Sequence, residues 1–518
     1  MRAAEQWEEK GWYQMRRHWR YSGIAFGLIA ALLTGCSADS KESIAMQDQI
    51  YADEAMPADA TASGENYQEI TENAFCDTVQ QPVSTFSADV DTASYSNLRR
   101  MIRWGYRMAD IPADAVRVEE LVNYFSYDYR LPEGDEPFGV TMQVAECPWN
   151  TEHQLLSIGL KSQDIDFTEA KPSNLVFLLD VSGSMQDADK LPLLQQAFTM
   201  LSENLTAKDR ISIVTYAGSD AVLLEGCPGD QSTVISAALS DLQASGSTNG
   251  STNGSAGIET AYALAEKFYL EDGNNRVILA TDGDLNVGVT SEHALSELIS
   301  RKKESGVYLT ALGFGTGNLQ DNKLETLADD GNGMYAYIDS VTEARKVLVE
   351  ELGANMVTVA EDVKLQATFS PAQVAQYRLI GYENRLLSQE DFEDDTKDAG
   401  EIGAGHTVTA LYELVLTDQA LAPENADAWM TLDVRYKKPH AKTSQLLEYQ
   451  LLASDYTDFP SEDFQFASCV AQFGMIVRNS AYCGGSVLQD VRERLTALGE
   501  QTDVYRAEFC DLVNTLEE

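Results

Sequence analysis

A set of oxygen-bearing side chains follows two apolar runs near the middle of the chain. Asp180, Ser182 and Ser184 occupy alternate positions after the run Leu175–Leu179, and Asp282 follows a second apolar run. Acids and hydroxyls together form the all-oxygen ligand type that hard divalent cations prefer. A loop that curls around an ion points every second side chain at it. The spacing therefore predicts a Mg²⁺ site, with Mn²⁺ or Ca²⁺ as alternatives.

The charges of these residues predict what the metal would do. Serine hydroxyls are neutral ligands, so they leave the positive charge of a divalent ion only partly compensated. We expect Asp180 and Asp282 to hold the ion through water or by hydrogen-bonding the serines. The ion would then accept one more anionic oxygen, which an Asp or Glu side chain of a partner would supply in an octahedral site. The residue set thus indicates binding of a partner with an exposed carboxylate.

Strands and helices alternate from Ser173 to about Leu352. Predicted strands contain LVFLLDV, RISIVTYA, AVLLEG, RVILATDG, VYLTALGFG and GMYAYID, and amphipathic helices lie between them. This alternation is typical of an α/β fold with a doubly wound, mostly parallel sheet and helices on both faces. Ligands of such sheets bind beyond the carboxyl ends of the strands, which is where Asp180 and Asp282 fall.

The regions on either side follow different patterns. Residues 84–172 contain a predicted strand around Phe86, helices near 94–104 and 114–129, and two strands just before the α/β region. Residues 353–518 begin with strands of alternating polarity and end, from about Phe459, in helices. We expect an antiparallel β-sandwich with one solvated face that recruits the two earlier strands, followed by a C-terminal helical segment.

The first 36 residues predict a secretory signal. Arginines follow Met15, an apolar run spans Ile24–Leu33, and the sequence LTGC ends at Cys36. The run is too short to cross a bilayer as a stable helix. LTGC resembles the bacterial lipobox, in which Cys36 becomes the lipidated first residue. An ordinary signal peptide is the alternative, and Met15 competes with Met1 as the start.

Residues 37–83 are rich in Asp, Glu, Ala, Ser, Thr and Gln and predict a disordered acidic tether. We therefore expect an extracytoplasmic protein, on the cell surface or the periplasmic side, held to the membrane by lipid alone. The net charge of −45 over 518 residues argues against nucleic-acid binding, which depends on basic patches. Six further cysteines form no CxxC pair, so zinc is not expected, and Cys469 and Cys510 lie in apolar helical patterns.

Three other motifs have simpler interpretations. Asp89–Ala93 (DVDTA) is similar to the aspartyl-phosphatase motif, but we favour a strand end in which Asp91 or Thr92 caps the next helix. Asp394–Gly400 (DDTKDAG) lacks the spacing of an EF-hand and predicts a solvated turn. Ser184 lacks the GxSxG context of a serine hydrolase. A metal-assisted hydrolase remains the alternative function, although no general base is evident near the oxygen-rich loops, and we expect no enzyme.

The central segment, Ser173–Leu352, resembles a von Willebrand factor type A (VWA) domain. The metal-ion-dependent adhesion site (MIDAS) of that family consists of DxSxS, a threonine and a later aspartate, and the four oxygen-bearing residues above match it position by position. The flanks resemble the YfbK-like group of exported bacterial VWA proteins, through FSADVDTASYSNLRR, DAVRVEELVNYF, YRLIGYENRLL and VAQFGMIVRNS. The resemblance implies metal-dependent binding of a protein or cell-envelope partner.

The resemblance also implies a threonine ligand, for which this chain offers two candidates. The tetrapeptide GSTN occurs twice, so Thr248 and Thr252 stand in the same local sequence. In the family pattern the threonine lies a few residues before a Gly-Ile pair that begins a helix. Thr252 lies five residues before Gly257-Ile258 and Thr248 lies nine before it. This spacing favours Thr252.

Overall fold

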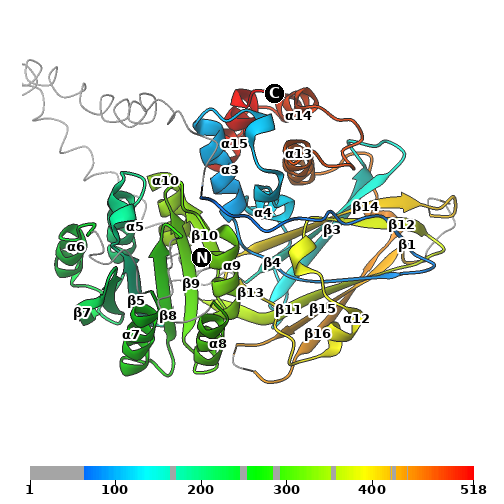
Figure 1. Cartoon of the computed structure of the whole chain (residues 1–518). Helices are drawn as coiled ribbons and strands as arrows, with labels where there is room; N and C mark the ends of the chain where they lie inside the picture. The colour runs from blue at the N-terminus through cyan, green and yellow to red at the C-terminus, as the bar shows by residue number, and fades with distance from the viewer. Residues whose placement is uncertain are drawn as a thin grey trace, which may run out of the picture. The chain divides into compact units, whose positions relative to one another are not determined.

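The computed structural model of the chain describes residues 64–163, 171–245, 254–283, 292–351, 357–420, 422, 427–439 and 441–518 (Figure 1). Cys36, Thr248 and Thr252 lie outside these ranges, as does the predicted signal sequence. The described part contains one sheet in the predicted α/β region and two antiparallel sheets in the flanking regions. None of its helices combines the length and the apolar character needed to cross a lipid bilayer.

The α/β region is built on a six-stranded sheet, as the alternating pattern predicts. Its strand order is β10-β9-β8-β5-β6-β7, and neighbours are parallel except for the β6–β7 hairpin. The strands are β5 (Ser173–Asp180), β6 (Arg210–Tyr216), β7 (Asp220–Pro228), β8 (Asn274–Thr281), β9 (Tyr308–Phe314) and β10 (Tyr335–Ile338).

Helices cover both faces of this sheet because its strands are apolar on both sides. Successive side chains of a strand point to opposite faces. In β5, Phe177 therefore packs with the core that includes α5, and Leu178 packs with the core that includes α7. The helices are α5 (Leu191–Ser202), α6 (Ser232–Ser240), α7 (Gly254–Lys267), α8 (Glu292–Lys303), α9 (Asp321–Asp330) and α10 (Val341–Arg345), the last followed by one π-helical turn.

The flanking strands form two five-stranded antiparallel sheets that share one apolar core. One sheet has the order β1-β12-β14-β4-β3, and the other has β13-β11-β15-β16 with β2 also paired to β11. Strands β3 and β4 precede the α/β region and β4 pairs with β14, so the predicted recruitment is confirmed. The strands are β1 (Cys76–Asp77), β2 (Val83–Ser87), β3 (Phe138–Glu146), β4 (Gln154–Ser162), β11 (Thr358–Phe369), β12 (Val374–Ile380), β13 (Gly400–Gly403), β14 (Thr407–Leu416), β15 (Met430–Lys437) and β16 (Gln445–Leu451).

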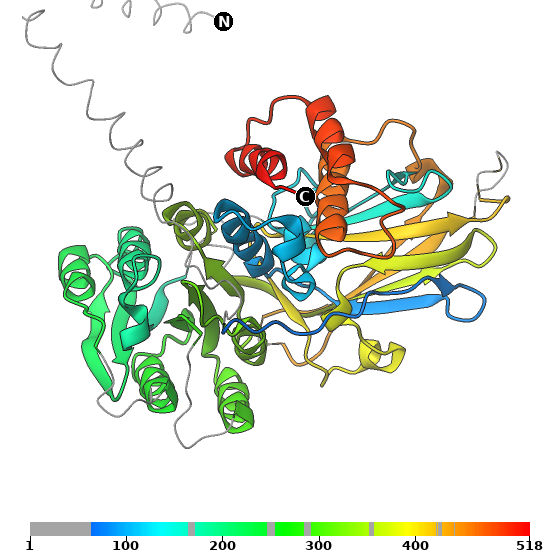
Figure 2. The ribbon, with the colours of Figure 1, turned by 45° about the horizontal axis from the view of Figure 1, so that its top comes forward.

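Helices from the two ends of the described chain pack together into a separate apolar core (Figure 2). The predicted helix over 114–129 is wrong in extent, since only 118–123 are α-helical. Beyond it, Tyr127 bonds the Val122 carbonyl and Tyr129 bonds Thr409, which holds this stretch outside the helix. Cys469 is buried in this core and Cys510 packs against it. The helices are α3 (Ala93–Arg103), α4 (Val118–Asn123), α13 (Glu462–Val477), α14 (Leu488–Leu498) and α15 (Val504–Thr515); α12 (Gln389–Glu393) lies in the sandwich region.

The predicted tether over 37–83 is wrong for residues 64–83, because these residues form main-chain contacts with distant parts of the chain. Gly64 donates its N–H to the Gly317 carbonyl (2.8 Å), and Asn66 donates to the Leu319 carbonyl (3.0 Å). Farther on, β1 pairs with β12. These partners lie some 250 to 300 residues away along the chain, so the local composition contained no sign of them.

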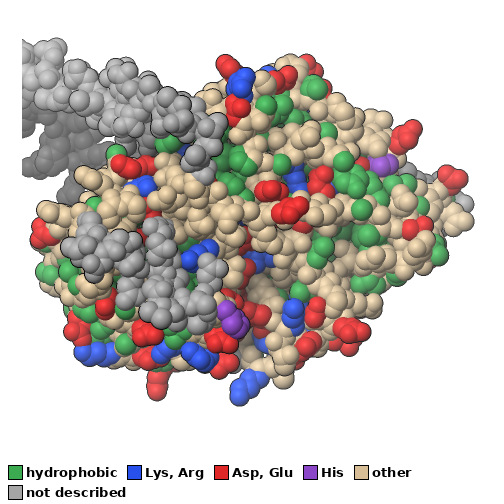
Figure 3. Space-filling model, viewed as in Figure 1, with side chains coloured by type: hydrophobic (Ala, Val, Ile, Leu, Met, Phe, Trp, Pro, Cys, Tyr) green, Lys and Arg blue, Asp and Glu red, His purple; other side chains and the backbone are tan. Residues whose placement is uncertain are grey.

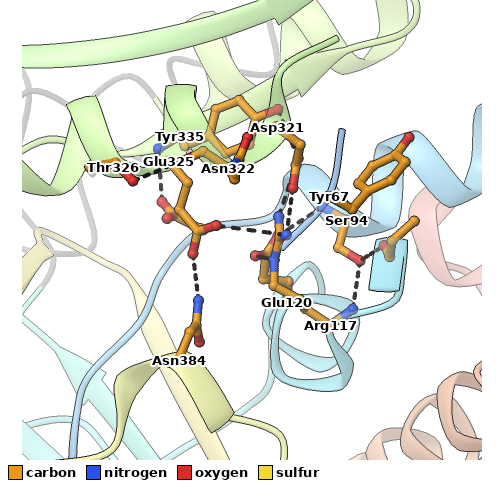
Figure 4. Close-up of polar contacts among 12 residues, drawn as sticks. Tyr67, Ser94, Arg117, Glu120, Asp321, Asn322, Glu325, Thr326, Tyr335 and Asn384 are labelled. Atoms are coloured by element: carbon orange, nitrogen blue, oxygen red, sulfur yellow. Dashed lines mark hydrogen bonds and ion pairs between the residues drawn. The ribbon is translucent and has the colours of Figure 1, made fainter. Parts of the chain in front are cut away.

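Buried ion pairs join the α/β region to its flank (Figure 4). Arg117, at the start of α4, contacts Glu120 and both oxygens of Asp321, the first residue of α9 (2.5 and 3.3 Å). The Tyr335 hydroxyl donates to the same carboxylate (3.0 Å), and Glu325 lies 3.7 Å from Arg117. Buried charges are tolerated when they are paired in this way. This network fixes α9, and with it the loop that precedes α9, against the flank.

Acidic side chains are spread over the surface. Figure 3 shows Asp and Glu distributed over the whole visible face, with Lys and Arg between them, instead of gathered on one element. Such a distribution suits a solubilising role for the net charge of −45.

Candidate metal site

Asp180 is the last residue of the central strand β5, and its side chain is completely buried. One carboxylate oxygen accepts the backbone N–H of Ser182 (2.8 Å), and the other accepts the hydroxyl of Thr281 from β8 (3.0 Å). Burial raises the pKa of Asp180 to about 7, and the nearby charge of Asp282 also raises it. A bound cation at this position would stabilise the ionised form of the Asp180 carboxylate.

Ser182 and Ser184 bring their hydroxyls together as the alternate spacing predicts. Their Oγ atoms are 2.8 Å apart. A short 3₁₀ turn, Gly183–Gln186, follows the strand, and Met185 is buried in the core beneath it. Because Met185 fixes the turn from below, the residues on either side of it are held in place at the carboxyl edge of the sheet.

Asp282 enters the same place from β8. That strand is the parallel neighbour of β5, so Asp282 follows the adjacent strand end, and its side chain is fully buried. Its Oδ2 atom lies 3.1 Å from the ammonium of Lys190. The structure thus brings together all four of the predicted ligands that it describes.

The loop that carries Thr248 and Thr252 lies outside the described residues, but its two ends are placed. Ser245 donates its N–H to the Val181 carbonyl (2.8 Å), next to Ser182. At the other end α7 begins at Gly254, and Gly257 packs so closely that an added Cβ would lie 3.0 Å from Tyr216. Both ends of the loop therefore flank the site, while the choice of threonine stays a prediction.

The donor set fits a hard divalent cation. Every predicted ligand in the described ranges offers oxygen, and the two carboxylates are shielded from water, where uncompensated negative charge is costly. Asp180, Ser182, Ser184 and Asp282 would hold such an ion, directly or through water. The ion would supply a Lewis-acidic position for an anionic oxygen.

Lys190 was missed by the sequence reasoning. It stands at the N-cap position of α5, and its side chain is only 5% exposed. A cation at a helix N-terminus opposes the helix dipole, so a lysine directly before a strongly apolar helix was an available signal. The ion pair with Asp282 explains why a lysine occupies this N-cap position.

The other motifs have structural roles. Asp91 accepts the N–H of Tyr335 (2.8 Å) and pairs with Arg385 (3.0 Å), and Thr92 forms no side-chain cap on α3, so the predicted capping is wrong. Asp395 bonds Ser444 and Arg435. Near this motif, the carboxylates of Asp362, Asp398 and Glu401 have oxygen atoms within 4.8 Å of one another. Two of these carboxylates form ion pairs with lysines, Asp362 with Lys437 and Asp398 with Lys303.

Comparisons with known proteins define the class first. Residues 174–350 match the von Willebrand factor type A domain, and residues 61–157 match a family described as von Willebrand factor. Residues 354–518 match the C-terminal region of the uncharacterized protein YfbK. The α/β region with its oxygen-rich edge is therefore a VWA domain.

The relatives then define the family. YfbK from Escherichia coli (strain K12) is 41% identical in an alignment of 471 residues, and the match covers 86% of this chain and 80% of that protein. The chain belongs to the YfbK-like family of VWA-domain proteins. Inter-alpha-trypsin inhibitor heavy chain H3 from Bos taurus is 27% identical over 37% of this chain and 22% of its own length. A solved von Willebrand factor type A structure from Catenulispora acidiphila covers 72% of this chain and 89% of its own, with 13% identity and a TM-score of 0.41.

Proposed function

We propose that this protein is a non-enzymatic envelope lipoprotein that binds a protein or cell-envelope partner through a divalent ion at the MIDAS. The observation that carries the proposal is the convergence of Asp180, Ser182, Ser184 and Asp282 at one edge of the sheet, with both carboxylates buried. VWA domains commonly bind proteins through such a site, which supports the same conclusion.

The serines and the aspartate of the site have different roles in binding. The Ser182 and Ser184 hydroxyls are neutral, so they leave positive charge on the ion for an incoming oxygen. Asp180 is held by Ser182 and Thr281, so its carboxylate has one orientation. Partner recognition then depends on an exposed Asp or Glu side chain that reaches the edge of the sheet. Mg²⁺ is the ion we propose, with Mn²⁺ or Ca²⁺ in its place under other conditions.

The test is Asp180→Ala in the full chain. Calorimetric titration with MgCl₂ and with MnCl₂ should show that affinity falls about tenfold or more, while circular dichroism stays unchanged because the residue lies at a strand end. Asp272→Ala is the matched control, since Asp272 is an exposed aspartate of the same domain and stands just before β8, at the opposite edge of the sheet. Equal metal affinity in the wild type and Asp180→Ala would refute the MIDAS assignment.

A second experiment separates binding from catalysis. Envelope extracts are passed over the immobilised protein with Mg²⁺ and with EDTA, beside a panel of esterase and phosphatase substrates. Metal-dependent capture without turnover is the expected result. Turnover that disappears in Asp180→Ala would favour a metal-assisted hydrolase instead.

A further inference from the structure

Lys190 is held rigidly beside the metal site. Its ammonium contacts Asp282 at 3.1 Å, and its aliphatic chain lies across Gly315, where an added Cβ would be 2.1 Å from the lysine Cγ. Gly315 has a φ of +69°, a conformation that favours glycine. The adjacent Thr316 donates to Asp189, the neighbour of Lys190 (3.3 Å). The lysine therefore has little freedom to turn away from Asp282.

The candidate metal site has two buried carboxylates, Asp180 and Asp282, but one lysine ammonium, Lys190, beside them. Asp180 and Asp282 are both fully buried, and burial of a carboxylate is costly unless a cation offsets it. With both carboxylates ionised, the ammonium of Lys190 leaves the group one negative charge. A bound divalent ion would turn that into one positive charge. Asp187 and Asp189 are further acidic residues of the segment between β5 and α5, and Asp189 also interacts electrostatically with Lys190.

We infer that Lys190 is a resident cation that tunes this site. It stabilises the buried carboxylates when no metal is bound, and it lowers metal affinity because two cations then share Asp282. It also leaves the loaded site with surplus positive charge for an anionic partner. This inference rests on the proposed function and adds regulation of the metal site by a protein side chain.

The test compares Lys190→Met and Lys190→Gln with the wild type, as full chains, by calorimetric titration with MgCl₂. Methionine keeps the stem that packs on Gly315, and glutamine also keeps a hydrogen-bond donor for Asp282. Both remove the charge, so both should bind Mg²⁺ about tenfold more tightly, which corresponds to about 1.4 kcal/mol. Lys208→Met is the matched control, since it removes an exposed lysine of the same domain and should leave affinity unchanged.

Thermal unfolding gives a second readout. In a chelator, both Lys190 variants should unfold at a lower temperature than the wild type, and added Mg²⁺ should raise their unfolding temperature by more. The titration of unfolding temperature against Mg²⁺ concentration also reports affinity for a variant that is unstable without metal.

The outcomes separate this inference from the function on which it rests. If the wild type binds Mg²⁺ and the Lys190 variants bind it equally or more weakly, the inference is overturned and the metal site stands. If only Lys190→Met binds more tightly, the hydrogen bond and not the charge is responsible, which also overturns it. If neither the wild type nor any variant binds metal, both the proposed function and the inference fail.

Discussion

Arg117 is the position where we expect a single substitution to reveal how the VWA domain is joined to its flank. The Arg117 side chain is 4% exposed, and its guanidinium contacts Glu120 of α4 and Asp321 at the start of α9 (2.5 Å). Glu325 lies within 3.7 Å. Arg117→Met keeps the aliphatic stem and removes the charge, so three buried carboxylates lose a shared cation.

The expected loss follows from the burial of those carboxylates. Removing one partner of a buried ion pair lowers the free energy of unfolding by about 3–5 kcal/mol, because the charge that is left has neither a counter-ion nor water to stabilise it. Burial already raises the pKa of Glu120, and it raises the pKa of Glu325 to about 8. A carboxyl group whose pKa is raised in the folded state makes the folded protein less stable as the pH rises toward that raised value. The penalty in Arg117→Met should therefore be larger at about pH 9 than at about pH 6.

A double-mutant cycle with Asp321→Asn isolates the contact. Urea unfolding is followed by circular dichroism and tryptophan fluorescence, whose agreement shows that one transition is measured. We expect a coupling energy of about 1–3 kcal/mol between Arg117 and Asp321. The matched control is the surface pair Arg107 and Asp110, which are 59% and 48% exposed. A coupling no larger than that of the surface pair would refute the reasoning.

Three further predictions concern other parts of the chain. Glu119→Gln should stabilise the protein increasingly as the pH rises above the ordinary pKa of a glutamate, measured by urea unfolding. Burial, reinforced by nearby Glu383, raises the Glu119 pKa, so the folded wild type keeps a proton that the unfolded chain loses and its stability falls as the pH rises, whereas glutamine stays neutral; parallel pH profiles would contradict this. Thr252→Ala should weaken Mg²⁺-dependent capture from envelope extracts about tenfold and Thr248→Ala should leave it near normal, and the reverse result would show that the duplicated GSTN shifts the register. Cys36→Ala should abolish labelling by a palmitate analogue and release the protein from membranes, whereas labelling that persists would exclude lipidation at this residue.

The candidate ligands could be grouped from the sequence because their spacing is local. Asp180, Ser182 and Ser184 need only a strand end and an alternate spacing, both of which are visible in a few consecutive residues. Asp282 could be added because parallel neighbouring strands place their carboxyl ends at one edge. The same local patterns predicted the α/β sheet and the strands of the sandwich, since apolar periodicity reflects which faces are buried.

The tertiary structure alone decided which distant charges meet. Lys190 faces Asp282 across 92 residues, and Arg117 faces Asp321 across 204. Gly64 pairs with Gly317 through backbone atoms, which leave no mark in the sequence. Composition suggested an acidic tether up to residue 83 because polar residues are common there, yet main-chain hydrogen bonds hold its end in place. Ion pairs and backbone pairing depend on where the fold brings chain segments together, whereas hydrophobic periodicity depends only on the neighbours of each residue along the chain.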